Sequence, residues 1–151
     1  MERLEYKSLP ARELKTDETG GELEGLAACF CNLDDSFWPD ILAPGCFAED
    51  LPVFLAEGFV SGINHDWCQP IGKTLEARET PDGLFVRAAI SDTTAGRDVR
   101  TLLRDGVVKR LSIGLRVLGR TWLETASEVS AWWQSVRYSP TTRTSSTSRS
   151  T

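Results

Sequence analysis

Residues 71–90 read IGKTLEARETPDGLFVRAAI, and this stretch decides the fold class. Two apolar-bearing runs, 71–79 and 84–90, flank the tetrapeptide Thr80–Gly83. Its Pro-Asp-Gly sequence suits a tight reversal, because proline presets the first turn angle and glycine tolerates positive φ. We therefore predict a β-hairpin here and a fold of the α+β class that is mainly β.

Further strands are predicted on both sides of this hairpin. Upstream, residues 3–10 alternate briefly, 21–31 alternate with Ala27 and Cys29 on one side, and 58–64 are strand-like. Downstream, residues 107–118 read VVKRLSIGLRVL. There we predict one long strand with an apolar row on one face, formed by Leu111, Ile113, Leu115 and Val117. Ser112, Gly114 and Arg116 would face the other way.

Two helices are predicted from apolar spacing. Asp92, Thr93 or Thr94 can cap a helix whose apolar stripe is Ala95, Val99, Leu102 and Leu103. Gly106 is placed to end that helix. A second set, Phe47, Leu51, Phe54 and Leu55, also has helical spacing. Pro52 must then lie in the first turn, so this helix is expected to be short or kinked.

Composition and charge restrict the class of protein. The chain has 151 residues, of which 40% are hydrophobic and 26% charged, which is typical of one globular domain. A net charge of −5 gives no basic surface for nucleic acid. No apolar run is long enough to span a membrane, and the first ten residues do not resemble a secretory signal, so we expect a cytoplasmic protein without a membrane partner.

The chain is expected to divide into three parts. Residues 1–120 would form the folded domain. Residues 121–138 diverge in character and place Leu123, Ala126, Val129, Trp132 and Trp133 at helical intervals. Residues 139–151 contain ten Ser or Thr and no apolar residue, so we expect a disordered tail.

A candidate for nucleophilic chemistry comes from the only histidine. Hydrolysis by a serine needs a base near neutral pKa, so His65 would have to be that base. Ser112 is the serine that a rigid strand would fix, and Gly114 on the same face leaves room for a substrate. Taken separately, a strand serine facing solvent and a histidine before Asp66 are more often ordinary polar residues. Spacing and polarity do not decide between these readings.

The cysteines offer an alternative of another class. Cys29, Cys31, Cys46 and Cys68 could join His65 in a metal-binding module. The C-x-C spacing of the first two differs from the usual C-x-x-C pair. Reduced cysteines that serve as small apolar residues fit the alternation of 21–31 better.

Five ordered blocks from Gly21 to Leu118 resemble the prohead (capsid maturation) serine proteases of tailed bacteriophages. The family pattern is a small-residue strand ending in Asn and Asp, an Asp-x-Ile/Leu-x-Pro-Gly-x-Phe loop, His-Asp followed by Pro-Ile-Gly, Asp-Gly-Leu, and Leu-Ser-Ile-Gly. In this chain the blocks are Asn32 with Asp34, Asp40 to Phe47, His65-Asp66 with Pro70-Ile71-Gly72, Asp82-Gly83-Leu84, and Leu111 to Gly114.

The resemblance implies a fold like that of the herpesvirus assemblin proteases, a β-barrel with a few packed helices. It implies Ser112 as the nucleophile and His65 as the general base, and no metal or organic cofactor. The expected substrates are phage scaffold and major capsid protein and the protease itself, cut in the host cytoplasm inside the assembling prohead, or in the bacterial cytoplasm for a prophage. A homo-oligomer is an open expectation.

The third catalytic residue is where this chain departs from the family. The family supplies a carboxylate in a Glu-Val-Ser-x-Val block, and Glu128-Val129-Ser130 matches only its first three letters. Glu128 is therefore the candidate. The alternative is that the last strands are missing from a truncated or out-of-frame ending, which would leave a remnant that binds capsid or scaffold protein without cutting it.

Overall fold

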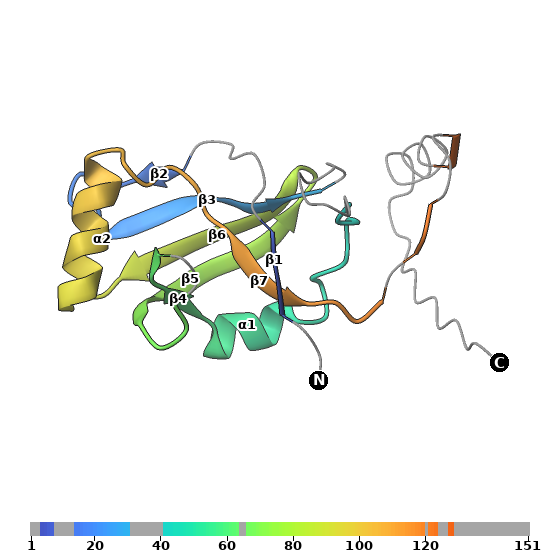
Figure 1. Ribbon diagram of the computed structural model, residues 1–151, viewed down its shortest axis with the longest axis horizontal. Helices are drawn as coiled ribbons and strands as arrows, with labels where there is room; N and C mark the ends of the chain where they lie inside the picture. Colours follow the sequence, from blue (N-terminus) through green and yellow to red (C-terminus); the bar gives the residue numbers. More distant parts are fainter. Residues whose placement is uncertain are drawn as a thin grey trace.

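The structure, a computed structural model, describes residues 4–7, 14–30, 41–63, 66–119, 121–123 and 127–128. Within them, five antiparallel strands form one open sheet in the order β2-β3-β6-β5-β4 (Figure 1). In sheet order their bounds are Lys15–Thr16, Glu22–Cys29, Gly83–Ile90, Pro70–Thr80 and Phe59–Ser61. A separate two-stranded ribbon pairs β1 (Leu4–Lys7) with β7 (Ile113–Arg116).

The predicted hairpin is confirmed as β5 and β6. Pro81 and Asp82 make the turn, and the Thr80 hydroxyl donates to the Gly83 carbonyl at 3.0 Å and accepts the Gly83 N–H at 3.2 Å. Gly83 also lies against β3, where a Cβ would approach the Ala28 carbonyl oxygen to 2.0 Å. The turn therefore needs glycine for close packing as well as for its backbone geometry.

The alternation predicted for residues 21–31 is wrong at one point. The register of β3 against β6 shifts between Leu26 and Ala28, which is a bulge. As a result Ala27 and Ala28, neighbours in sequence, are both buried, at 5% and 1% exposure. An extra residue in one strand interrupts the period of two, and the sequence pattern does not show where this happens.

Both predicted helices are present. α2 (Thr94–Arg104) begins at Thr93, whose hydroxyl accepts the Gly96 N–H at 3.0 Å, and ends before Gly106, which has φ 68°. α1 (Leu51–Glu57) is short, with Pro52 in its first turn, where a missing N–H costs no hydrogen bond. α2 buries Val99 and Leu103, whereas α1 buries none of its residues.

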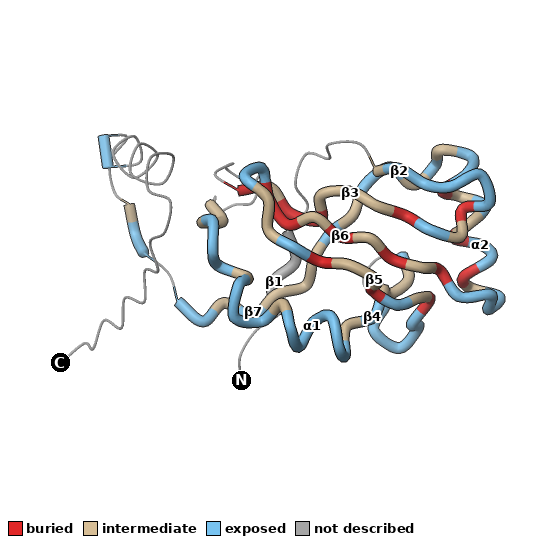
Figure 2. Tube along the Cα trace, turned by 180° about the vertical axis from the view of Figure 1, so that it is seen from behind, coloured by how far each residue is buried: buried red, intermediate tan, exposed pale blue. Residues whose placement is uncertain are grey.

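The core has two parts, and its buried residues lie on β3, β5, β6 and α2 (Figure 2). The hairpin cluster consists of Ala27, Ala28, Ala77, Leu84 and Val86. The helix cluster consists of Leu23, Ile71, Ala88, Ile90, Val99 and Leu103. Leu111 packs against both clusters, so the segment that leads into β7 crosses the boundary between them.

The long strand predicted over 107–118 is wrong in its extent, because only Ile113–Arg116 is a strand. The cause is the end of α2. The N–H groups of Val107 and Val108 both donate to the Leu102 carbonyl, at 2.8 and 3.2 Å. These backbone groups complete the C-terminus of the helix, so they are not available to a sheet.

The described strands give a mainly β fold with two helices, as predicted, but they do not close into the predicted barrel. The sheet ends in short strands on both sides, β2 with two residues and β4 with three. Among the residues that the structure describes, no helix is long and apolar enough to cross a membrane.

Candidate active site

Ser112 stands immediately before β7, not in mid-strand as predicted. Its two neighbours, Leu111 and Ile113, both pack against the hairpin cluster, and Ser112 itself is exposed. Because side chains alternate along extended backbone, two inward neighbours turn the serine away from the core. The core thus fixes the backbone on both sides of an accessible hydroxyl.

The ribbon of β1 and β7 continues directly from this serine. Ile113 pairs with Lys7 and Gly114 with Tyr6, so Ser112 lies at the end where the paired register begins. Figure 1 shows this ribbon passing in front of the five-stranded sheet. A residue at the end of a paired strand has a backbone held by the pairing and a side chain that a substrate can reach. A catalytic nucleophile needs both.

His65 lies outside the described residues, but the base of its loop is described. The loop runs from Gly62 to Gln69 between β4 and β5, and the Gly62 N–H donates to the Gln69 carbonyl at 3.0 Å. The Gln69 N–H donates in turn to the Asp66 carbonyl at 3.0 Å. These hydrogen bonds join the two described ends of the loop, which flank His65 in the sequence.

Asp66 has a turn-forming contact within this loop. Its Oδ1 accepts the Cys68 N–H at 3.0 Å, an arrangement in which a side chain closes a turn two residues on. The Trp67 ring in the same loop packs edge to face against the Phe59 ring of β4, with 5.8 Å between the ring centroids. Both contacts fix the segment that follows His65.

The segments that carry the two predicted catalytic residues share one anchor in the core. Val60, before the His65 loop, packs against the helix cluster, and Ile71, after the loop, belongs to that cluster. Leu111, which precedes Ser112, packs against the same cluster. Segments about fifty positions apart in sequence therefore pack in the same cluster.

A residue that the sequence analysis missed supports the Pro-Gly loop. Glu79, at the end of β5, accepts the Gly45 N–H at Oε2 and the Phe47 N–H at Oε1, each at 2.8 Å. Phe47 also stacks on Phe30, with ring centroids 6.1 Å apart, and packs against the hairpin cluster. No local pattern reveals this contact, because it joins residues 32 and 34 positions apart.

Glu128 lies in a two-residue helical piece with Ser127 and is exposed. Figure 1 shows this piece beyond the end of the sheet, apart from the β1–β7 ribbon. The helix predicted over residues 121–138 is wrong at its start, because residues 121–123 are described and are not helical. Residues 124–126 and 129–138 lie outside the described residues. The role of Glu128 as the third catalytic residue stays a prediction.

The described cysteines are Cys29, Cys46 and Cys68. Within the described ranges, no group of three or more His, Cys, Asp and Glu side chains is arranged to hold a metal ion. Cys31 and His65, which the metal-binding alternative also requires, lie outside those ranges.

A comparison with protein families gives one match. The model of the caudovirus prohead serine protease family matches residues 7–136. The chain belongs to this family. The matched range of this prohead serine protease includes the blocks around His65 and Ser112, and it extends past Glu128. No significant match was found among curated proteins or among solved structures.

Proposed function

We propose that this prohead serine protease is an endopeptidase that cleaves scaffold or capsid protein, and itself, during prohead assembly. The observation that carries the proposal is the family match over residues 7–136. An exposed Ser112 between two core-anchored neighbours supports its assignment as the nucleophile. Val60 and Ile71, on the strands that flank His65 in the sequence, share the helix cluster with Leu111 beside Ser112, and this supports the assignment of His65 as the base.

The mechanism follows from the chemistry of a serine and an imidazole. His65 takes the proton of the Ser112 hydroxyl as the oxygen attacks the scissile carbonyl carbon, and a tetrahedral oxyanion forms. The imidazolium then gives its proton to the leaving amine, and the peptide C–N bond breaks to leave an acyl-enzyme. Water, deprotonated by His65, opens the ester and restores the serine.

Two further groups are needed for full activity. Backbone donors must stabilise the oxyanion, and each is worth about 3 to 4 kcal/mol in related chemistry. A carboxylate must orient the imidazole, and we assign this role to Glu128. With one histidine in the chain, a second imidazole cannot take that role.

The test is labelling and cleavage by the intact chain. A fluorophosphonate probe, which reacts with activated serines, should label Ser112 and should fail to label Ser112→Ala and His65→Ala. Ser91→Ala is the matched control, since Ser91 is also exposed and is adjacent to a strand, immediately after β6. Coexpression with the capsid and scaffold proteins of the same phage should then give cleavage products that Ser112→Ala removes.

Two outcomes would contradict the proposal. Equal cleavage by Ser112→Ala would exclude this nucleophile. Failure of the unsubstituted chain both to label and to cut would favour the remnant that binds capsid or scaffold protein without cutting it. Stoichiometric zinc in the purified protein would instead support the metal-binding module.

A further inference from the structure

An apolar surface surrounds α1 and the His65 loop. We call it the α1 surface, and it consists of Val53, Phe54, Leu55, Phe59, Ile63 and Trp67. Each of these side chains is between 36% and 57% exposed. The six residues come from one stretch of the chain, 53–67, in which the Phe54 ring lies against Gly58 and the Phe59 ring contacts the Trp67 ring. A group of neighbouring exposed apolar side chains marks an interaction site more often than single exposed apolar residues do.

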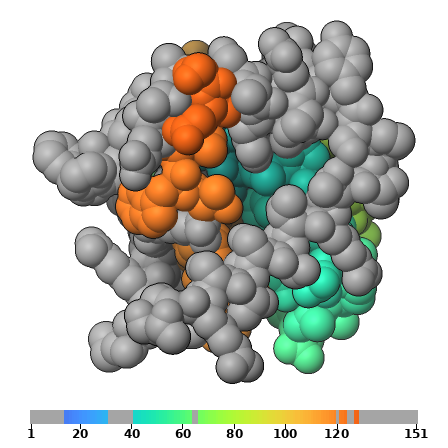
Figure 3. Space-filling model, turned by 90° about the vertical axis from the view of Figure 1, so that its right-hand side faces the viewer, coloured from blue at the N-terminus to red at the C-terminus, as the bar shows by residue number. Residues whose placement is uncertain are grey.

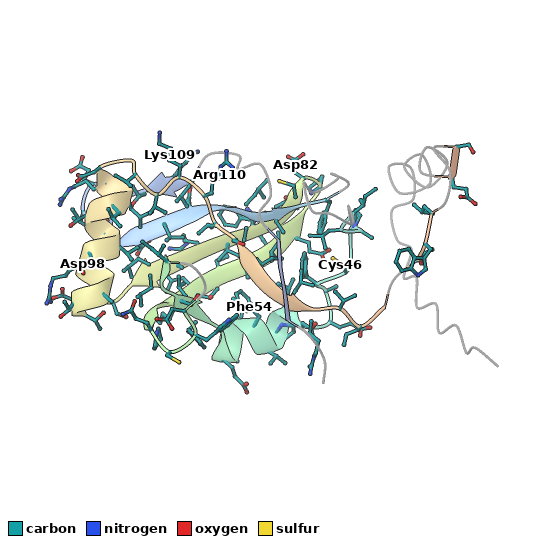
Figure 4. All side chains as sticks on the ribbon, in the orientation of Figure 1. Cys46, Phe54, Asp82, Asp98, Lys109 and Arg110 are labelled. Atoms are coloured by element: carbon teal, nitrogen blue, oxygen red, sulfur yellow. The ribbon has the colours of Figure 1, made fainter. Side chains whose placement is uncertain are left out.

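The place of the surface in the fold leaves it open. β4 is the edge strand of the sheet and has three residues, with a register shift before the last. α1 has no buried residue, so the helix contributes its side chains mainly to the outside. Figure 4 shows α1, with Phe54 labelled, along the lower margin of the molecule, at a distance from α2 with Asp98.

The α1 surface is next to the proposed catalytic residues. Ile63 and Trp67 are each two positions from His65 in the sequence. Leu51 of α1 and Ile113 beside Ser112 pack against the same hairpin cluster. Figure 3 shows parts of the segments 41–57 and 107–123 on one face of the molecule. Segments that carry the α1 surface and Ser112 are therefore anchored in the same cluster.

Charge selects what the surface can bind. Residues 16–72 contain eleven Asp and Glu and no Lys or Arg, although the whole chain has 17 Lys and Arg. Four of these acids, Glu49, Asp50, Glu57 and Asp66, are exposed in the segments that form the α1 surface. Lys73, which is exposed and pairs with Phe59 across β4 and β5, adds one positive charge, so the four acids leave the rim with a net negative charge. An apolar surface with a negative rim attracts positively charged partners and repels negatively charged ones.

We propose that the α1 surface binds the polypeptide substrate and selects segments that combine apolar residues with Lys or Arg. This inference rests on the proposed function and names its substrate class. A second copy of the chain fits less well, because an isologous contact would bring two acidic rims together. An acidic segment is excluded for the same electrostatic reason.

Binding of defined peptides tests the proposal without requiring cleavage. The probes are three fluorescein-labelled 12-residue peptides, one of Leu and Lys, one of Leu and Glu, and one of Ser and Lys. The protein is the full chain with Ser112→Ala, and anisotropy is measured from low to high NaCl. The Leu-Lys peptide should bind at least about tenfold more tightly than either of the others, and its affinity should fall with salt.

Variants locate the binding. Asp50→Lys with Glu57→Lys should weaken the Leu-Lys peptide about tenfold, while Asp98→Lys, an exposed acid on α2, should leave the affinity unchanged. Phe54→Ser should also weaken binding of the Leu-Lys peptide. The control for this variant is Val107→Ser, because Val107 is 66% exposed and lies outside the α1 surface. Circular dichroism of each variant reports whether it remains folded.

The proposal is overturned if the Leu-Glu peptide binds as well as the Leu-Lys peptide, or if Asp98→Lys weakens binding as much as the α1 double variant. These outcomes are separate from those of the proposed function. Fluorophosphonate labelling of Ser112 with no charge selectivity would reject only the α1 surface. Selective binding by a chain that never labels would reject only the protease activity.

Discussion

The Glu79 carboxylate holds the backbone of Phe47, with Oε1 2.8 Å from the Phe47 nitrogen, while its other oxygen binds the Gly45 nitrogen at the same distance. One side chain on β5 thereby orders the loop that leads into α1. Since α1 buries none of its own residues, its position depends on contacts of this kind and on the packing of Phe47 and Leu51. The loop, the helix and the sheet act as one unit at this end of the molecule.

Removal of this carboxylate should destabilise the fold. Glu79→Ala leaves two N–H groups without their charged acceptor, and we expect the free energy of unfolding to fall by about 2 kcal/mol. Urea denaturation measures it. Glu76→Ala is the control, because Glu76 makes exposed ion pairs with Arg78 and Arg87, and it should cost less than about 1 kcal/mol. Equal losses in the two variants would show that Glu79 acts only as a surface charge.

Leu111 should support both stability and activity. Leu111→Ala removes contacts to both core clusters, and we expect the free energy of unfolding to fall by about 2 kcal/mol, the lower end for a partly buried leucine. Cleavage at a temperature where the variant is folded should still decrease, because the Ser112 backbone loses its support. Leu118→Ala, with the side chain 76% exposed, provides the control. Unchanged turnover in folded Leu111→Ala would contradict the positioning role.

Thr74 should limit the stability of the core. Thr74 is 7% exposed, and its buried hydroxyl has no hydrogen-bond partner among the residues that the structure describes. Thr74→Val replaces this hydroxyl by a methyl group, and we expect the free energy of unfolding to rise by about 1 kcal/mol. Thr80→Val should do the opposite, because the Thr80 hydroxyl bonds both backbone groups of Gly83. A loss of stability in Thr74→Val would refute this account of the orphaned hydroxyl.

Acid should act on the turn between β2 and β3 through Asp17. The Glu22 N–H and then the Thr19 hydroxyl donate to this carboxylate, and they lower its pKa below the usual value. A lowered pKa in the folded state means that the stabilisation is complete above the unfolded pKa, about 3.9, and is lost as the pH falls through the folded pKa.

Asp17→Asn should therefore lower the melting temperature at pH 7, and the difference from the unsubstituted chain should shrink as the pH falls below the unfolded pKa, about 3.9. Thermal melts between pH 2 and pH 8 measure this. Glu18→Gln, at the exposed neighbouring position, is the control and should show no such convergence. A difference that stays constant over the whole range would contradict the titration of Asp17.

Glu128 is tested by a neutral isostere. If it orients the imidazole of His65, Glu128→Gln should reduce cleavage by up to about ten-thousandfold while leaving the melting temperature unchanged. Activity within twofold of the unsubstituted chain would remove it from the site.

Local patterns predicted the elements whose signals are local. The Pro-Asp-Gly turn predicted the β5–β6 hairpin, and Gly106 predicted the end of α2. The sequence allows Asp92, Thr93 or Thr94 at the start of α2, and the structure shows Thr93 as the cap. The pattern over 107–118 failed because the N–H groups of Val107 and Val108 bind the end of α2. An apolar alternation cannot report that a preceding helix has taken the hydrogen bonds that a strand would need.

The sequence by itself determined the mainly β class, the two helices and the family, because periodicity, turn chemistry and ordered motifs are written along the chain. Only the tertiary structure showed that Leu111, Val60 and Ile71 meet in one core, that Glu79 orders the Gly45–Phe47 loop, and that β3 carries a bulge. Each of these depends on contacts between residues distant in sequence. Such contacts arise from packing and hydrogen bonding across the whole fold. The spacing of residues along the sequence does not reveal them.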